Sequence, residues 1–313
     1  MTNQQTNQQA DRQTDQQTDR QTHGTTDPAT DAARGGQGGA GGTTVVVTGA
    51  TGRTGGAVAA AAAAAGLTVR AASRATGFDW ADRSTWAAVL RGADAAYLAY
   101  PTDVGSPEAT EAVGEIAREA VALGVRRLVL LSARGEDRAL PTEEALAASG
   151  ARWTVVRAAW FAQNFSAGPL ADELRASGGL VFAAAEGVRE PFVDVRDIAD
   201  VVVTALTSGD RWAGRAVEVT GPRLLTWGEA VAEIGAAAGR ELTYRAVPVR
   251  DYRERLIAFG VPAAGADFLT DLFADLLDGR NAQVTDGVET VLGRPARDFS
   301  AFAKEAGAEG VWG

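Results

Sequence analysis

The 313-residue sequence contains no cysteine, which excludes disulfides, thiolate catalysis and cysteine-ligated metals. Its single histidine, His23, lies in a polar N-terminal stretch, so a histidine-based catalytic or metal site cannot form inside a folded core. Lys304 is the only lysine and stands close to the C-terminus. We therefore expect no metal, and any chemistry must use Asp, Glu, Tyr, Ser, Thr, Asn, Arg or a cofactor.

The charge balance and the lack of long apolar runs restrict the partners. The formal net charge is −10, from 30 basic and 40 acidic residues, and the phosphate backbone of a nucleic acid repels such a surface. The sequence has no run of about 18 uncharged apolar residues that could span a membrane. The N-terminus also lacks the basic-then-apolar layout of a secretory signal. We expect a cytoplasmic protein that binds neither nucleic acid nor a membrane.

Residues 1–42 differ in composition from the rest of the chain. Gln, Thr and Asp recur there, and the stretch ends in a glycine-rich run. It has almost no apolar side chains whose burial would offset the entropy lost on ordering. We expect a disordered tail, which is either functional or a dispensable leader.

From residue 43 on, strand and helix patterns alternate, which predicts an α/β protein with a Rossmann-like, doubly wound parallel sheet. The first expected strands cover residues 44–48, 67–73, 95–100, 127–132 and 153–157. The helices between them cover residues 56–65, 84–90 and 107–123, and a fourth is capped by Thr142 and ends at residues 149–150. Later strands are expected at 180–182 and 216–219, and later helices at 195–206, 227–238, 250–259 and 265–277. We expect residues 43–158 to form an NAD(P)-binding domain. Residues 159–313 are expected to form a smaller, mostly helical substrate-binding lobe, with some strands returning to the sheet.

A glycine-rich turn follows the first expected strand and opens a helix, which is the context that a dinucleotide-binding fingerprint requires. Gly49 permits a sharp turn, Gly52 lets backbone amides approach a pyrophosphate, and Gly55 lets the helix pack close to the strand. The helix N-terminus then offers free N–H groups and a partial positive charge to the phosphates. We expect these glycines to bind a cofactor together with Thr51, Arg53 and Thr54. The alternative is a tight strand–helix turn without a ligand.

The end of the second strand bears on the choice of cofactor. An NAD site usually carries Asp or Glu about 20 residues past the first glycine, where the carboxylate binds the ribose hydroxyls. This chain instead has Ser73 and Arg74, which could hold a 2′-phosphate by charge-assisted hydrogen bonds worth roughly 1.5–3 kcal/mol each. The pattern favours NADP(H), with Arg53 as a second candidate for that phosphate. The alternative is an Arg74 side chain that merely lies in solvent.

Four more residues are candidates for cofactor contacts. Asp79 and Trp80 are expected at the adenine edge, although an Asp79 that caps a helix is nearly as good an interpretation. Tyr100 and Pro101 end the next strand and are expected to border the nicotinamide.

These residues resemble the NmrA-like branch of the atypical short-chain dehydrogenases/reductases. The resemblance extends from about residue 43 to residue 302 and is carried by residues 48–55, 78–80, 130–133, 157–165, 191–199 and 220–226. Within the branch, and through residues 285–299, the chain is most similar to the clavine (ergot) alkaloid reductases such as festuclavine dehydrogenase and agroclavine synthase. The resemblance implies an NADPH-dependent oxidoreductase of secondary metabolism. It leaves the substrate open, because the branch also contains quinone reductases and non-catalytic redox sensors.

Typical short-chain dehydrogenases protonate their product with a Tyr-x-x-x-Lys pair on the helix that follows the strand ending at Ser132. In this chain that helix, near residues 142–149, contains neither Tyr nor Lys. General acid catalysis contributes about 10²–10⁴-fold, and its loss matters least for an iminium or a quinone acceptor. The residues therefore favour direct hydride transfer to a pre-activated acceptor, with positioning and exclusion of water as the protein's contribution. A protein that transfers no hydride at all would also have no need of this Tyr and Lys.

Ser132 and Asn164 are the catalytic candidates that remain. Ser132 could orient the substrate or the nicotinamide amide, and a serine bonded to backbone is an equal alternative. Asn164 is expected near the nicotinamide, and the substrate pocket is expected to include Trp160, Phe161 and Phe165. The alternative is that these aromatic side chains are plain core residues between the two lobes.

Three acidic residues have ordinary structural interpretations. Asp197 is expected to cap the helix that begins at residue 198. Glu143 and Glu144 could anchor a cationic amine, although a carboxylate pair in the first turn of a helix usually compensates its dipole.

The sequence thus supports an NADPH-dependent reductase of an iminium, enone or quinone-like small molecule. One alternative is a redox-sensing regulator that binds NADP and a protein partner without turnover. Another is a Rossmann-type isomerase or epimerase.

Overall fold

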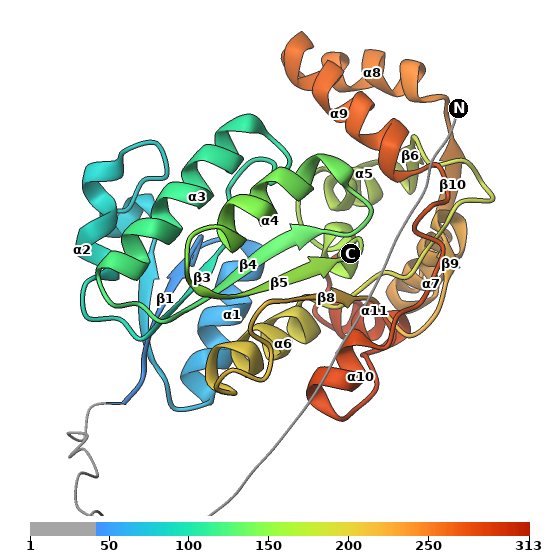
Figure 1. Ribbon diagram of the computed structural model, residues 1–313. Coiled ribbons are helices and arrows are strands. Elements are labelled where there is room, and N and C mark those ends of the chain that lie inside the picture. The colour runs from blue at the N-terminus through green and yellow to red at the C-terminus, as the bar shows by residue number, and fades with distance from the viewer. Residues whose placement is uncertain (1–41) are drawn as a thin grey trace, which may run out of the picture. The chain divides into compact units, whose positions relative to one another are not determined.

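A six-stranded parallel sheet forms the centre of residues 42–313, the part of the chain that the computed structural model describes (Figure 1). The expected tail lies outside the described residues, except for Gly42. The spatial order of the strands is β2-β1-β3-β4-β5-β8. Their bounds are β1 Thr44–Thr48, β2 Thr68–Ala72, β3 Ala95–Leu98, β4 Arg127–Ala133, β5 Arg152–Ala158 and β8 Arg215–Val219.

Strand β1 lies in the interior of the sheet because its sequence suits burial on both faces. Its three valines are fully buried, and β-branched side chains pack well on a pleated surface. Val45 and Val47 join the apolar cluster under one layer of helices, and Val46 joins the cluster under the opposite layer. Because β2 and β3 lie on opposite sides of β1, the strand order reverses there. In such sheets ligands bind in the crevice at the carboxyl ends of the strands beside this reversal.

Helices cover both faces of the sheet (Figure 1). On one face α1 (Arg53–Ala64) packs against α6 (Val195–Thr207), which also contacts α10 (Gly287–Leu292). The other face carries α2 (Trp86–Leu90), α3 (Pro107–Ala122) and α4 (Leu140–Ala147). Short 3-10 helices occupy three connections: η1 Arg74–Thr76, η2 Arg83–Thr85 and η3 Asp137–Ala139. The fold class predicted from the sequence is confirmed.

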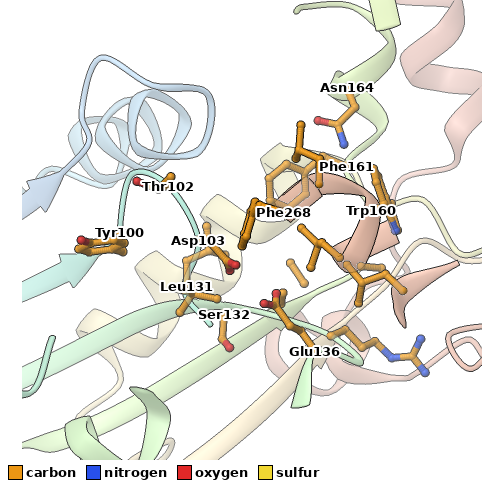
Figure 2. A pocket seen from close by; sticks show the side chains of 18 residues that line it. Tyr100, Thr102, Asp103, Leu131, Ser132, Glu136, Trp160, Phe161, Asn164 and Phe268 are labelled. Carbon is orange, nitrogen blue, oxygen red and sulfur yellow. The ribbon is translucent and has the colours of Figure 1, made fainter. Parts of the chain in front are cut away.

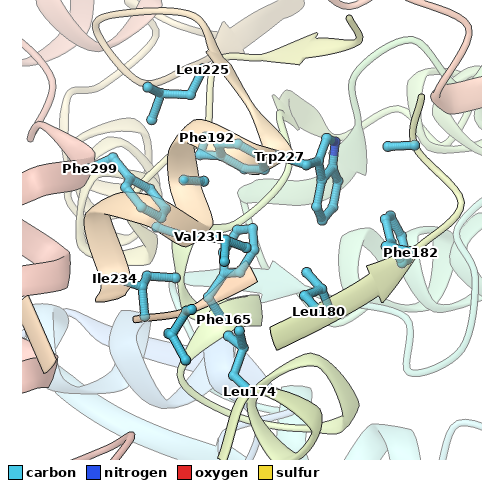
Figure 3. Packing of buried hydrophobic residues seen from close by; sticks show 14 of the residues in the cluster. Phe165, Leu174, Leu180, Phe182, Phe192, Leu225, Trp227, Val231, Ile234 and Phe299 are labelled. Atoms are coloured by element: carbon cyan, nitrogen blue, oxygen red, sulfur yellow. The ribbon is translucent and has the colours of Figure 1, made fainter. Parts of the chain in front are cut away.

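A mostly helical lobe follows β5, and its core is rich in aromatic side chains (Figure 3). Phe165, Phe192, Trp227 and Phe299 meet there, with ring centroids 5.2–5.6 Å apart among the contacting pairs. The lobe contains two small two-stranded sheets, β6–β10 and β7–β9. Its elements are η4 Ala162–Phe165, α5 Pro169–Ser177, β6 Gly179–Phe182, β7 Arg189–Glu190, β9 Leu225–Thr226, α7 Trp227–Ala238, β10 Thr243–Ala246, α8 Val249–Ala258, α9 Ala263–Leu276 and α11 Phe299–Ala308. Among residues 42–313, no helix is both long enough and apolar enough to cross a membrane.

The expectation that Thr142 caps a helix is wrong. Helix α4 begins two residues earlier, at Leu140, and continues directly from η3. The buried Thr142 hydroxyl instead donates a hydrogen bond to the carbonyl oxygen of Val104 (2.7 Å) and lies 2.8 Å from the Thr110 hydroxyl. A tertiary contact between α4 and the segment around α3 therefore accounts for this threonine, and a local cap does not.

The expectation that Asp197 caps its helix is also wrong. Asp194 is the N-cap of α6, and its side chain accepts a hydrogen bond from the backbone N–H of Arg196 at 2.8 Å. Asp197 is fully buried and forms ion pairs with Arg294 and Arg297. A buried carboxylate needs such partners, because an unpaired charge in the interior is strongly destabilising.

Gly55 brings α1 against β1, and we expect Gly55→Ala to lower the free energy of unfolding by about 1–3 kcal/mol. An added Cβ would overlap the carbonyl oxygen of Gly49 and would lie 2.8 Å from that of Thr48. Backbone atoms cannot move aside as the end of a flexible side chain can. At Gly56 the added Cβ would make an ordinary 3.4 Å contact with Ala50, so Gly56→Ala should be neutral or stabilising by up to about 1 kcal/mol. Guanidinium unfolding measures both variants, and a Gly55→Ala protein as stable as the control would contradict this packing argument.

Candidate functional site

The turn between β1 and α1 has the features that a diphosphate site requires. Gly49 has a φ of +63°, and Gly52 at the N-cap is extended and gives α1 no side-chain cap. The N–H groups of the first helical turn are therefore left without a side-chain acceptor, and Thr51, Gly52 and Arg53 are exposed. Free amides and the positive end of a helix favour an anionic group at this position. The residues present thus fit the pyrophosphate of a dinucleotide.

Two residues of the turn serve packing. Gly55 leaves no room for a Cβ between α1 and the end of β1. Thr54 is buried in the first turn of α1. The structure therefore offers Thr51, Gly52 and Arg53 on the exposed side of the turn and keeps Thr54 and Gly55 beneath it.

Ser73 and Arg74 lie next to this turn at the end of β2. The two segments are joined directly, because the Gly49 N–H donates to the Ala72 carbonyl oxygen at 3.0 Å. Ser73 is buried and forms a capping box with Thr76 of η1. Arg74 is the first residue of η1 and is exposed. Its guanidinium is therefore accessible to a phosphate group on the ribose side of the turn.

Asp79 and Trp80 belong to an aromatic corner next to the same edge of the sheet. Trp80 makes edge-to-face contacts with Tyr100, at a centroid distance of 5.3 Å, and with Phe78 and Trp86. The Asp79 carboxylate accepts a hydrogen bond from the Ala81 N–H (3.0 Å) and so stabilises a local turn, while Asp82 caps η2. This corner adjoins the strand end at Tyr100, next to the exposed Pro101.

A cavity of about 310 Å³ opens between the carboxyl ends of the strands and helix α9 (Figure 2). Tyr100 and Ser132 line it from the ends of β3 and β4, and Trp160, Phe161 and Asn164 line it from the segment after β5. Helix α9 closes the opposite side with four apolar side chains, those of Phe268, Leu269, Leu272 and Leu276. Pro101 is absent from the cavity wall, to which the next residues, Thr102 and Asp103, contribute instead.

Ser132 is held by side chains, which neither sequence interpretation foresaw. Its hydroxyl donates a hydrogen bond to Glu143 Oε1 at 2.6 Å. The same carboxylate pairs with the guanidinium of Arg157 on β5, with 2.6 Å between Glu143 Oε2 and Arg157 Nη2. This hydrogen bond and the nearby charge of Glu143 raise the pKa of Arg157. Glu143 is thus occupied inside the protein, and Glu144 lies exposed on α4 outside the cavity wall, so neither anchors a cationic amine there.

Asn164 connects the cavity to the glycine-rich turn. The Arg53 guanidinium donates a hydrogen bond to Asn164 Oδ1 and a second one, of 2.9 Å, to the carbonyl oxygen of Ala167. Partial burial lowers the pKa of Arg53, which stays far above neutral pH. One arginine thus joins the glycine-rich turn to a residue of the cavity wall.

The aromatic residues after β5 divide between two roles. Trp160 and Phe161 line the cavity, as expected for a pocket wall. The assignment of Phe165 to the pocket is wrong, because this side chain is fully buried in the core of the second lobe (Figure 3). The Trp312 indole N–H donates to its carbonyl oxygen at 2.7 Å, which ties Phe165 to the C-terminus.

Two carboxyl groups in the cavity wall escaped the sequence analysis. Glu136, in the loop after β4, and Asp103, in the loop after β3, are 7% and 8% exposed, and both line the cavity (Figure 2). Burial, together with a hydrogen bond to Asp103 and its charge, raises the pKa of Glu136 to about 8. Their positions just past two strand ends were the only sequence signal, because the pairing depends on the tertiary fold.

Comparisons with known proteins place this geometry in a family. A scan of protein-family models matches none to the chain. The NAD(P)H azoreductase of Xenophilus azovorans is 31% identical over 247 residues, which cover 76% of this chain and 84% of the relative. The chain belongs to the NmrA-like atypical short-chain dehydrogenases/reductases.

Other similar proteins have names that refer to different compounds. A (4-alkanoyl-5-oxo-2,5-dihydrofuran-3-yl)methyl phosphate reductase of Streptomyces griseus is 34% identical and covers 75% of this chain and 86% of its own. Festuclavine synthase I of Penicillium roqueforti is 27% identical, with coverage of 72% and 82%. The NADPH-dependent quinone oxidoreductase QOR2 of Escherichia coli shares the fold at a TM-score of 0.69 and 22% identity, with coverage of 83% and 99%. The printed names of the relatives include an NAD(P)H azoreductase, a reductase and a dehydrogenase, and we class this protein with them as an NAD(P)H-dependent oxidoreductase.

We expect Glu143→Gln to lower the free energy of unfolding by about 1–3 kcal/mol. Removing one partner of a buried pair costs about 3–5 kcal/mol, and this figure is discounted here because the Arg157 side chain is 28% exposed. Glu144→Gln is the matched control, since its side chain is exposed one residue further along α4. Thermal and guanidinium unfolding measure both variants. Equal stability of the two would show that the Ser132–Glu143–Arg157 contacts contribute little.

Proposed function

We propose that the protein is an NADPH-dependent reductase that transfers hydride to a pre-activated small molecule of the iminium, enone or quinone-like class. One observation carries the proposal: the exposed, uncapped start of α1 and the apolar cavity lie at the same edge of the sheet. The strand-order reversal beside β1 is where such folds bind dinucleotides. The names of the azoreductase and of the dihydrofuranone phosphate reductase support acceptors that take up hydride readily.

The residues of this chain would bind, orient and desolvate the reactants. The amides after Gly52 would hold the diphosphate, and NADPH bound there would supply the hydride. Trp160, Phe161 and the apolar face of α9 would exclude water and position a planar acceptor. Asn164 would hold a polar group of the reactants at the cavity wall. Ser132 would shape the same wall while its hydroxyl stays hydrogen-bonded to Glu143.

Within this proposal NADP(H) is favoured over NAD(H). No acidic side chain stands at the end of β2, and the exposed Arg74 lies two residues past it, after Ser73. A guanidinium attracts a 2′-phosphate, which an aspartate in the same place would repel. A location in the cytoplasm, a role in secondary metabolism and the absence of nucleic-acid partners stay predictions of the sequence.

A redox-sensing regulator is the second candidate function, and one observation favours it. The Ser132 hydroxyl is engaged with Glu143, so the strand end offers no free hydroxyl for catalysis. A sensor would bind NADP and a protein partner, and it would not oxidise NADPH with any acceptor.

We expect the purified protein to oxidise NADPH in the presence of menadione or an N-alkylated cyclic iminium at a rate far above that of buffer. Asn164→Ala and Ser132→Ala should each lower kcat, because both residues shape the cavity, while NADPH binding measured by fluorescence is retained. The expected loss is about tenfold, the equivalent of one hydrogen bond of roughly 1.4 kcal/mol. NADPH binding without turnover across such a panel would favour the sensor, and unchanged rates in both variants would refute the site assignment.

We expect Arg74→Ala to weaken NADPH binding by about tenfold to a hundredfold and to leave NADH binding nearly unchanged. The reason is that a charge-assisted bond to phosphate is worth roughly 1.5–3 kcal/mol and the ribose of NADH carries no phosphate. Isothermal titration with both cofactors provides the measurement. Arg91→Ala, which removes another exposed arginine, is the control for a general effect of charge. Equal weakening of both cofactors would rule out a 2′-phosphate contact.

A further inference from the structure

The carboxyl groups of Glu136 and Asp103, both in residues that line the cavity, each have one buried oxygen without a hydrogen-bond partner. Glu136 Oε1 and Asp103 Oδ2 are both buried, and neither has a hydrogen-bond partner when the two groups are taken as carboxylates. The other Asp103 oxygen, Oδ1, accepts from the Gly105 N–H at 2.8 Å and so fixes the loop. Gly105 also leaves space for Glu136, because an added Cβ there would overlap Glu136 Oε1. The backbone is thus shaped around a carboxyl pair at the cavity wall (Figure 2).

The surroundings of the pair favour retention of one proton. Two buried carboxylates side by side repel each other, and the repulsion disappears when one of them is protonated and donates to the other. Asp275 of α9 adds a further negative charge, which raises the pKa of Glu136, and Arg138 of η3 opposes it. Arg138 also faces Asp275 across 3.8 Å, and the nearby Arg134 is engaged by Glu218 at 2.9 Å. Neither arginine therefore acts on Glu136 alone.

Glu136 and Glu143 differ in their hydrogen-bond partners, and a proton donor requires the surroundings of Glu136. Glu143 accepts hydrogen bonds from Ser132 and Arg157, which stabilise its charged form. Glu136 has no such donor on Oε1 and stands in a wall shared with Trp160 and Phe268. A buried carboxyl group beside a second carboxyl group retains its proton more readily and can give it to a bound molecule.

We propose that Glu136, held protonated beside Asp103, is the proton donor to the substrate during reduction. The assignment rests on the proposed reductase function. When a quinone or an enone is reduced, the acceptor gains a hydride, which NADPH supplies, and one proton. The Glu136 O–H bond breaks, a new bond to hydrogen forms on the acceptor, and the electron pair of the O–H bond stays on the Glu136 carboxylate. Solvent then returns a proton to the pair. Asp103 acts as a positioning residue, because it keeps that proton on Glu136 near neutral pH.

The test compares two acceptors that differ in their need for a proton. Menadione takes up a hydride and a proton, whereas an N-alkylated cyclic iminium becomes a neutral amine on hydride transfer alone. We expect Glu136→Gln to lower kcat with menadione by about tenfold, less than the full effect of general acid catalysis because the hydroquinone anion is itself stabilised, and to leave kcat with the iminium unchanged. The substitution keeps the shape of the side chain and its neutral charge at pH 7. Glu144→Gln, on an exposed position, is the matched control.

The pH profile and an infrared titration complete the test. The rate with menadione should fall as the pH rises through about 8, and in Asp103→Asn this fall should move to lower pH, because a negative neighbour is lost. In the cofactor-free protein, infrared difference spectra should show the C=O stretch of a protonated carboxyl at pH 7. That band should disappear above pH 8 and be reduced in Glu136→Gln. Circular dichroism confirms that each variant is folded.

Three results would overturn the proposal. They are equal losses with both acceptors in Glu136→Gln, a wild-type protein that reduces only the iminium, and a Glu136 carboxylate already ionised at pH 7. Absence of NADPH oxidation with either acceptor would refute the proposed reductase and, with it, the catalytic role of Glu136. The part of the infrared band that is lost in Glu136→Gln separates this case, since it reports on the Glu136 proton without turnover.

Discussion

The close backbone contact between the start of α1 and the end of β1 is the constraint on which the rest of the site depends. Gly55 lies against the carbonyl groups of Gly49 and Thr48, where no other residue fits without displacement. This contact sets the position of α1, and the extended N-cap at Gly52 then leaves the first amides of the helix uncapped. The backbone N–H groups at such a helix start have no acceptor, and the oxygens of a diphosphate can accept their hydrogen bonds. The adjoining cavity follows from the same geometry, because parallel strands present all their carboxyl ends at one edge.

The second lobe covers the carboxyl ends of the strands with apolar side chains, which lowers the local dielectric constant there. Helix α9 places apolar side chains over the strand ends. The aromatic core around Trp227 stabilises the lobe to which this helix belongs. Exclusion of water strengthens every charge interaction inside the cavity and penalises unpaired charges. The ionisable groups near the cavity therefore differ according to the side chains that bind them. Glu143 is bound by Arg157 and Ser132, while burial and a carboxyl neighbour raise the pKa of Glu136 to about 8.

The sequence allowed prediction of those features that short segments encode by themselves. Strand β1, helix α7 and the Ser106–Pro107 start of α3 were predicted at their observed bounds, because β-branched runs, caps and helical periodicity are local. The assignments of Thr142, Asp197 and Phe165 failed for the opposite reason. Their partners, Val104, Arg297 and Trp227, are distant along the chain, and a tertiary contact decided each role. Glu136 escaped notice on the same ground, since its protonation depends on Asp103 from another loop.

In typical short-chain dehydrogenases one helix carries the Tyr-x-x-x-Lys pair. In this protein the corresponding helix, α4, has a structural role instead. Helix α4 reads Leu-Pro-Thr-Glu-Glu-Ala-Leu-Ala, and its Glu143 neutralises Arg157 at the end of β5. Because both oxygens of Glu143 are engaged by a guanidinium and a hydroxyl, this helix contributes structure to the strand ends. The ability to donate a proton then depends on a group with the reverse environment, buried and beside a like charge. Among the carboxyl groups that line the cavity, the Asp103–Glu136 pair has that environment. Loss of the usual acid from one helix is thus compatible with proton-coupled reduction, because the electrostatics of the neighbouring loop can supply the same function.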